Sequence, residues 1–86
     1  MIWEVVVGKR AEKTLGTLPK PTRERIIQSI NKLKDGPYQP GLDVKPLNGR
    51  PEWRLRVGDW RVLFLVYNAE IRIIVISVSP RGDAYK

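Results

Sequence analysis

Apolar and polar positions alternate most regularly between residues 53 and 66, where the sequence reads WRLRVGDWRVLFLV. Gly58-Asp59 at its centre is a signal for a two-residue β-turn, because glycine readily adopts the positive φ that such a turn requires. A hairpin closed there pairs Val57 with Trp60 and, moving outward, Arg56 with Arg61, Leu55 with Val62, Arg54 with Leu63 and Trp53 with Phe64. Successive side chains of a strand point to opposite faces. One face of the hairpin is therefore apolar, and the other carries Arg54, Arg56 and Arg61.

The first half of the chain predicts a strand and two helices. The β-branched run Ile2–Val7 is typical of a strand, and apolar residues spaced by three and four positions predict a helix from Lys9 to about Leu18. A second helix is expected from Pro21 to Lys34, where Asp35-Gly36-Pro37 ends it. The link between the helices is so short that they should form an antiparallel hairpin.

The second half of the chain predicts a sheet. Val44–Leu47 is expected to be a brief extended segment ahead of the hairpin, and Ile71–Ser79 follows it. That last run is so apolar that we expect a central strand covered on both faces. The order is then β-α-α-β-β-β: a single α+β domain over residues 1–86, with an N-terminal strand and an antiparallel helical hairpin on one face of a mostly antiparallel sheet.

The helices are expected to cover only one of the two faces of the hairpin. The face with Trp53 and Phe64 is the more apolar and should pack inward. The arginine face should stay partly open, although Leu63, Leu65 and Tyr67 lie beside it. A bent sheet, with its polar end open and its apolar end covered, would accommodate both.

The charge of the chain indicates an acidic partner. The formal net charge is +7, with six of the seven lysines in the first 45 residues and six of the nine arginines from Arg50 onward. Like charges directly opposite on a sheet destabilise it, by up to about 1 kcal/mol. Three guanidinium groups kept together on one face therefore favour a bound anion, and arginine suits bidentate phosphate contacts. The basic residues of the two helices are expected to form a solvated outer face.

The composition also excludes several kinds of chemistry. The chain has no Cys and no His, so we expect no disulfide, no thiolate nucleophile, no zinc site and no cofactor. No signal peptide is visible at the start, and no apolar run reaches the roughly 18 residues of a membrane span. A cytoplasmic protein without a membrane partner is the default expectation.

Two motifs carry a resemblance to a known family. PLNGRPEWRLRVGDWRVLFLV followed by ISVSPRGDAYK resembles the RelE/ParE toxin superfamily, and specifically its RelE-like branch. The resemblance implies the toxin of a type II toxin–antitoxin system. RelE-like members cleave mRNA in the ribosomal A site without a metal, whereas ParE-like relatives poison DNA gyrase. It also implies an acidic antitoxin that folds as it binds and that supplies any contact with DNA.

The resemblance further implies an active site. Its positions correspond to Arg54, Arg56, Arg61, Arg81 and Tyr85 in this sequence. The implied reaction is attack of a ribose 2′-hydroxyl on the adjacent phosphate, giving a 2′,3′-cyclic phosphate and a free 5′-hydroxyl. Clustered guanidinium groups can stabilise the charge of the phosphorane. A base stacked on Tyr85 can help to align the nucleophile.

The identity of the general base is left open by the sequence. Better-studied family members carry Lys at the positions of Arg54 and Arg56, and arginine is a poor base at neutral pH. The alternatives are Tyr85, which we favour, Glu52, Asp83, or alignment by ribosomal RNA without a strong protein base. Glu52 is more simply a surface carboxylate that eases repulsion among the arginines, and Asp83 a turn residue or a partner of Arg81.

Three classes of function follow. The first is a ribosome-dependent endoribonuclease toxin, the second a toxin that inhibits an enzyme such as gyrase, and the third a plain RNA-binding module. The arginine cluster favours the first over the second, because a protein-blocking toxin needs no phosphate site. Trp53 and Trp60 are expected to be packing residues rather than stacking platforms, and Arg72 an exposed edge charge.

Overall fold

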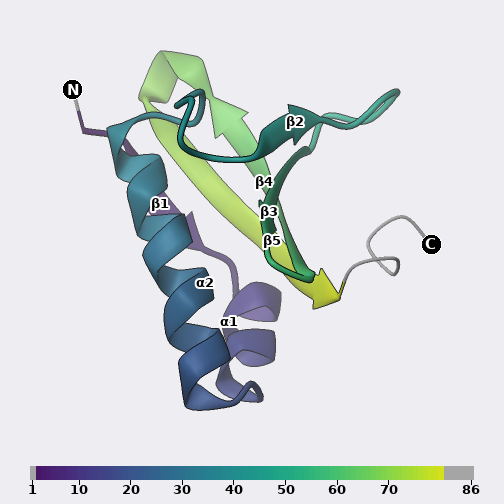
Figure 1. Cartoon of the computed structure of the whole chain (residues 1–86). Coiled ribbons are helices and arrows are strands. Elements are labelled where there is room, and N and C mark those ends of the chain that lie inside the picture. Colours follow the sequence, from purple (N-terminus) through teal and green to yellow (C-terminus); the bar gives the residue numbers. More distant parts are fainter. Residues whose placement is uncertain (1, 81–86) are drawn as a thin grey trace.

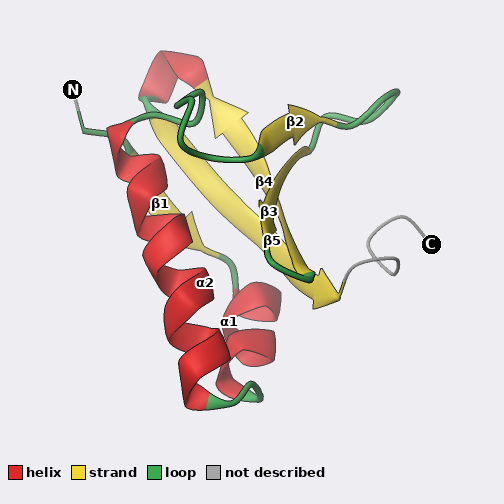
Figure 2. Cartoon of the chain, viewed as in Figure 1, coloured by secondary structure: helices red, strands yellow, loops and turns green. Residues whose placement is uncertain are grey.

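The chain forms an α+β domain, as the sequence predicts. The computed structural model describes residues 2–80; Met1 and residues 81–86 lie outside the described part. The elements in chain order are β1 (Glu4–Val7), α1 (Lys9–Gly16), α2 (Lys20–Lys32), the 3₁₀ helix η1 (Leu33–Asp35), β2 (Val44–Pro46), β3 (Trp53–Val57), β4 (Trp60–Tyr67), the 3₁₀ helix η2 (Asn68–Glu70) and β5 (Arg72–Pro80). In Figure 2, α1 and α2 lie to one side of β3, β4 and β5. No helix within residues 2–80 is long and apolar enough to cross a membrane.

The five strands form one sheet in the order β1-β5-β4-β3-β2. β1 pairs with β5 in parallel, and the other neighbouring strands are antiparallel. α1 and α2 lie on the same side of this sheet (Figure 1). The expected order β-α-α-β-β-β counted three strands after the helices. The extended segment expected near residues 44–47 is in fact a fourth, β2, and Pro46 is tolerated there because β2 is an edge strand.

The hairpin of β3 and β4 has the predicted register. All five expected pairs are present, from Val57 opposite Trp60 to Trp53 opposite Phe64. Gly58 has a φ of +59°, so the turn uses the left-handed conformation that glycine adopts without a steric penalty. The alternation of side chains therefore places the apolar and arginine faces as the sequence indicates.

The hydrophobic core lies between the helices and the predicted inner face of the hairpin. Leu55, Val62 and Phe64 are at most 1% exposed. They pack in one cluster with apolar residues of α1, α2, η1 and β5, namely Ala11, Leu15, Ile26, Ile30, Leu33, Ile73, Val75 and Val78. Burial of this apolar surface is the main stabilising contribution to the fold.

Two expectations about the other face are wrong. β5 is an interior strand, but its residues alternate between buried and partly exposed, so it is covered on one face only. The helices lie on a single side of the sheet, and the parallel pairing with β1 does not add a second layer. The sheet also does not open at its polar end and close at its apolar end, because Leu63 is 6% exposed and Tyr67 is 40% exposed.

Gly8 and Gly16, at the two ends of α1, should respond oppositely to alanine. A Cβ on Gly8 would lie 2.9 Å from the carbonyl oxygen of Val75, whereas a Cβ on Gly16 meets nothing within 4 Å. We expect Gly8→Ala to lower the free energy of unfolding by about 1–3 kcal/mol through overpacking. Gly16→Ala should raise it by about 0.5–1 kcal/mol, because alanine favours the helix. Urea denaturation measures both, and a loss for Gly16→Ala would contradict the open space beside it.

Candidate active site

Arg56 and Arg61 form the centre of the candidate site, on the face of the sheet that no helix within residues 2–80 covers. They are directly opposite one another on β3 and β4, and Arg61 pairs on its other side with Ser79 of β5. Arg56 is exposed, and its Nε donates a hydrogen bond to the Gly58 carbonyl at 3.4 Å, whereas Arg61 is half-buried. The register thus places two guanidinium-bearing side chains on one surface, near the turn of the hairpin.

Arg54 shares this face but is not open to solvent as expected. It is 6% exposed, and its guanidinium pairs with Asp43 Oδ1 at 3.1 Å. The backbone carbonyl of Asp43 also accepts a hydrogen bond from the Arg56 N–H at 2.9 Å. Because Asp43 offsets its charge, Arg54 contributes less positive potential to the surface than the exposed Arg56 does.

Asp43 is a residue that the sequence reasoning missed. It lies eleven positions before Arg54, in a stretch without regular periodicity. The pairing of β2 with β3 brings the two together, because Val44 lies opposite Leu55. The only sequence signal for this contact was the short extended segment expected at residues 44–47, for which no pairing partner was predicted.

Removal of the Asp43 charge should weaken the fold measurably. Exposed ion pairs contribute less than about 1 kcal/mol, and loss of one partner of a buried pair costs about 3–5 kcal/mol. The Arg54 side chain is 8% exposed and that of Asp43 is 47% exposed, so Asp43→Asn should lower the free energy of unfolding by about 1–2 kcal/mol. Urea denaturation measures it. Asp35→Asn, an exposed carboxylate in η1, is the matched control and should change stability by less than about 0.5 kcal/mol.

Glu52 is bound to Arg50 rather than to the arginines of the open face. Two hydrogen bonds join them, from Arg50 Nε to Glu52 Oε1 at 3.3 Å and from an Arg50 terminal nitrogen to Oε2 at 2.9 Å. The hydrogen bonds from Arg50 lower the pKa of the Glu52 carboxyl below its ordinary value. A carboxylate with a lowered pKa is a weaker base, so this geometry argues against Glu52 as the general base.

The remaining predicted site residues follow the end of β5. Arg81, Asp83 and Tyr85 lie outside the described residues, so their predicted roles stay predictions. β5 ends at Pro80, which pairs with Trp60, the residue before Arg61. Arg81 is the next residue in the chain.

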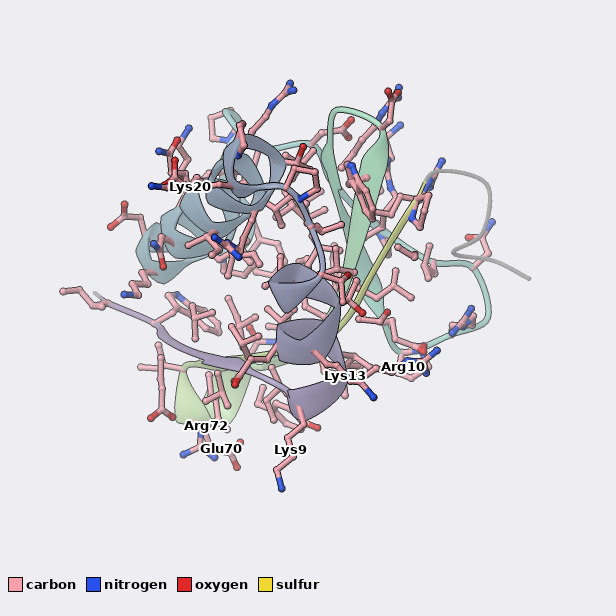
Figure 3. The ribbon with its side chains drawn as sticks, turned by 90° about the horizontal axis from the view of Figure 1, so that it is seen from below. Lys9, Arg10, Lys13, Lys20, Glu70 and Arg72 are labelled. Carbon is pink, nitrogen blue, oxygen red and sulfur yellow. The ribbon has the colours of Figure 1, made fainter. Side chains whose placement is uncertain are left out.

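The other singled-out residues lie away from the arginine face or at its far end in the described part of the chain. Trp53 packs edge-on against Tyr38, with ring centroids 5.3 Å apart, and Trp60 is half-buried against the core. Arg72 is exposed as expected, but it begins the interior strand β5 rather than an edge strand, and its hydrogen-bonded ion pair with Glu4 raises its pKa. Lys9 and Lys13 project outward from α1 (Figure 3), in keeping with a solvated helix face.

The arrangement can bind an anionic group such as a phosphate. Arg56 and Arg61 supply charged donors on an uncovered surface, and the end of β5 lies beside them. Within residues 2–80, no three Asp, Glu, His or Cys residues gather closely enough to hold a metal ion.

Comparison with known proteins places the chain in a family. The family model of the ParE toxin of the type II toxin–antitoxin system parDE matches residues 5–85. RelE1 of Methanocaldococcus jannaschii, a curated relative named as a toxin, is 34% identical over 88 residues, which cover all of this chain and 98% of the relative.

Solved structures with the same fold include complexes of such toxins. RelE in the archaeal RelE–RelB complex from Pyrococcus horikoshii has a TM-score of 0.82 and 31% identity, covering 98% of this chain and all of that one. The RelB–RelE complex from Methanococcus jannaschii matches with a TM-score of 0.74 and 27% identity, over 93% of this chain and 94% of that one. The chain belongs to the RelE/ParE superfamily of toxins of type II toxin–antitoxin systems.

Proposed function

We propose that this toxin is a metal-independent endoribonuclease that cleaves translated mRNA in the ribosomal A site. The observation that carries the proposal is the pairing of Arg56 with Arg61 on the face of the sheet opposite α1 and α2. The register keeps these two like charges opposite one another, at a cost of up to about 1 kcal/mol. A phosphodiester bound between them offsets that cost. Such a toxin would act in the cytoplasm, where mRNA is translated.

The proposed reaction needs charge stabilisation and an aligned nucleophile. The ribose 2′-hydroxyl attacks the adjacent phosphorus, the bond to the 5′-oxygen breaks, and a 2′,3′-cyclic phosphate and a 5′-hydroxyl result. Arg56, Arg61 and Arg81 are proposed to stabilise the extra negative charge of the phosphorane. Tyr85 is proposed to stack on a base and to accept the 2′-hydroxyl proton.

We propose a different role for Arg54 in this site. It shares the face of Arg56 and Arg61, pairs with Asp43, and supports the positive potential of the face without being its most accessible donor. Substitution of Arg54 should therefore affect folding as well as cleavage, whereas substitution of the exposed Arg56 should affect cleavage alone.

We infer an antitoxin as the protein partner. The related RelE chains were solved in complexes with RelB, and this chain carries a net charge of +7. An acidic segment that folds as it binds would neutralise the arginine face and exclude RNA from it. Contact with DNA would come only through that antitoxin.

Induced expression in a bacterium tests the proposed function. Incorporation of labelled methionine should stop, and primer extension on a translated reporter mRNA should reveal new 5′ ends within codons. The same reporter without a start codon should stay intact, because cleavage requires translation. Intact mRNA in cells whose translation has stopped would contradict the proposal.

Inhibition of DNA gyrase is the second candidate, because the matching family model is that of ParE. Plasmid supercoiling measured in the same cultures separates the two. Loss of negative supercoiling with intact mRNA supports the gyrase function. The uncovered arginine pair favours the nuclease, since inhibition of a protein by contact does not require a phosphate site.

A further inference from the structure

A second concave site lies on the opposite side of the β3–β4 turn, facing α2. Its volume is about 180 Å³, and it is lined by Thr22, Arg25, Ile26, Val57, Asp59 and Trp60. Ile26 and Val57 are 1% and 7% exposed and form an apolar floor. Arg25 and Asp59 are exposed, and Thr22 and Trp60 are half-buried. The pocket therefore combines an apolar base with one cation, one carboxylate, one hydroxyl and one indole.

Arg25 lies flat against the turn. The guanidinium carbon and both terminal nitrogens are each 3.4 Å from the position that a Cβ of Gly58 would occupy. Equal distances to these three atoms mean that this position lies over the guanidinium plane. The plane thus packs on the glycine, and its hydrogen-bonding edge remains available, since no described residue forms an ion pair with Arg25.

The chemistry of this pocket fits a nucleobase. Bases outside a duplex are recognised by stacking on aromatic rings or guanidinium planes and by hydrogen bonds to their edges. Arg25 and Asp59 cancel in formal charge, so the charged lining residues together do not select for a phosphate or for an acidic peptide. A neutral planar group that both donates and accepts hydrogen bonds can pair with the Arg25 guanidinium and with the Asp59 carboxylate.

We propose that this pocket binds one base of the RNA substrate, and that guanine fits it best. The N1–H and the 2-amino group of guanine present adjacent donors for the Asp59 carboxylate, and its O6 and N7 accept from arginine. Arg25, Asp59 and Trp60 are then the residues that determine which sequences are cut. The inference that they act on a substrate rests on the proposed nuclease function.

The turn connects the pocket to the arginine face. Gly58 contacts Arg25 on the side of the helices, and its carbonyl accepts the hydrogen bond from Arg56. Arg56 and Val57 are consecutive residues of β3, so their side chains point to the two opposite faces of the same hairpin, and Val57 lines the pocket. A nucleotide near the phosphate held by Arg56 and Arg61 can therefore reach around the tip of the hairpin into the pocket.

Binding of mononucleotides tests the pocket without cleavage. In ¹H–¹⁵N NMR spectra, guanosine monophosphate should shift the Trp60 indole N–H and the Gly58 amide saturably, and uridine monophosphate should bind at least about tenfold more weakly. Asp59→Asn should weaken guanosine monophosphate binding about tenfold, whereas the control Asp35→Asn should not change it. Inorganic phosphate should leave the Trp60 indole unshifted.

Three results would overturn the inference. One is an equal response of Trp60 to guanosine monophosphate, uridine monophosphate and phosphate. Another is no response to any of them. The third is a response only to an acidic antitoxin peptide, which would make the occupant a protein segment.

A map of cleavage sites then connects the pocket to the reaction. For wild type, cuts should cluster at a fixed offset from guanine, and Arg25→Ala and Asp59→Asn should reduce that preference about tenfold or more. Arg10→Ala, an exposed arginine of α1, should keep the preference. If wild type cuts mRNA and the variants keep its preference, the pocket inference is wrong and the nuclease stands. If guanosine monophosphate binds but no mRNA is cut, the proposed function is wrong and the guanine site stands.

Discussion

Replacement of Arg61 by alanine is expected to reduce mRNA cleavage by at least about 100-fold. Removal of one preorganised donor from an active site that stabilises developing charge costs about 10²–10³ in rate. Arg61 is the best placed of the described arginines for this role, because β4 is the middle strand of the sheet and the side chain is half-buried. Single-turnover cleavage of a reporter mRNA on translating ribosomes measures the effect.

The matched control lies on the same face of the sheet. Arg72 is exposed and pairs with Tyr67 at the other end of β4, six residues or roughly 20 Å from Arg61. Arg72→Ala removes an equal charge and should change the cleavage rate less than about threefold. Arg61→Lys keeps the charge but loses the bidentate geometry, and should retain intermediate activity. Equal losses for Arg61→Ala and Arg72→Ala would indicate a general effect of charge and contradict a defined site.

Arg56 offers a second measurement that separates function from folding. It is exposed and lies opposite a like charge, so Arg56→Ala should leave the free energy of unfolding unchanged or raise it by up to about 1 kcal/mol. Cleavage by the same variant should fall. A lower activity together with an equal or higher stability is the signature of a residue retained for function.

The hairpin could be predicted from the sequence because its signals are local. Gly58 determines the turn, the turn determines the register, and the register determines which residues share a face. The arginine pair therefore follows from a few adjacent residues. The elements themselves were also predicted to within a few residues at each end, since proline and glycine mark most of the boundaries.

The exposure of the arginines could not be predicted in the same way. Arg54 was expected beside Arg56 and Arg61, and it shares their face, but Asp43 covers and pairs with it. That contact depends on how β2 docks, and β2 has only three residues and no alternation to reveal its partner. The prediction that β5 is covered on both faces was wrong for a related reason. A run of apolar residues shows that a strand is interior, but it does not show whether a second layer covers it.

The guanine pocket was also invisible in the sequence. Arg25 was not singled out there, and Asp59 appeared only as a turn residue. Only the packing of α2 against the tip of the hairpin brings them together, across more than thirty positions of sequence. A site that forms only when a helix packs against a distant turn has no local sequence motif by which it could be recognised.

Two leucines on opposite faces of the sheet test whether one face is covered and the other is open to solvent. Leu55 is 1% exposed and faces the helices, whereas Leu65 is half-buried on the face without helices. Both become alanine by the same chemical change, so a difference in their effects reports their surroundings. For 86 residues, a typical free energy of unfolding is about 4–13 kcal/mol, which makes a loss of a few kcal/mol easy to detect.

Leu55→Ala should lower the free energy of unfolding by about 3–4 kcal/mol, because it removes buried methyl groups and leaves a cavity that the core cannot fully close. Leu65→Ala should cost only about 1 kcal/mol, since water already reaches part of that side chain. Urea denaturation at fixed pH measures both. If the antitoxin covers the face without helices, Leu65 is buried in the complex. The loss of unfolding free energy caused by Leu65→Ala should then be larger in the complex than in the isolated chain. Equal losses for the two variants of the isolated chain would mean that a second layer covers the arginine face, and that RNA cannot reach it.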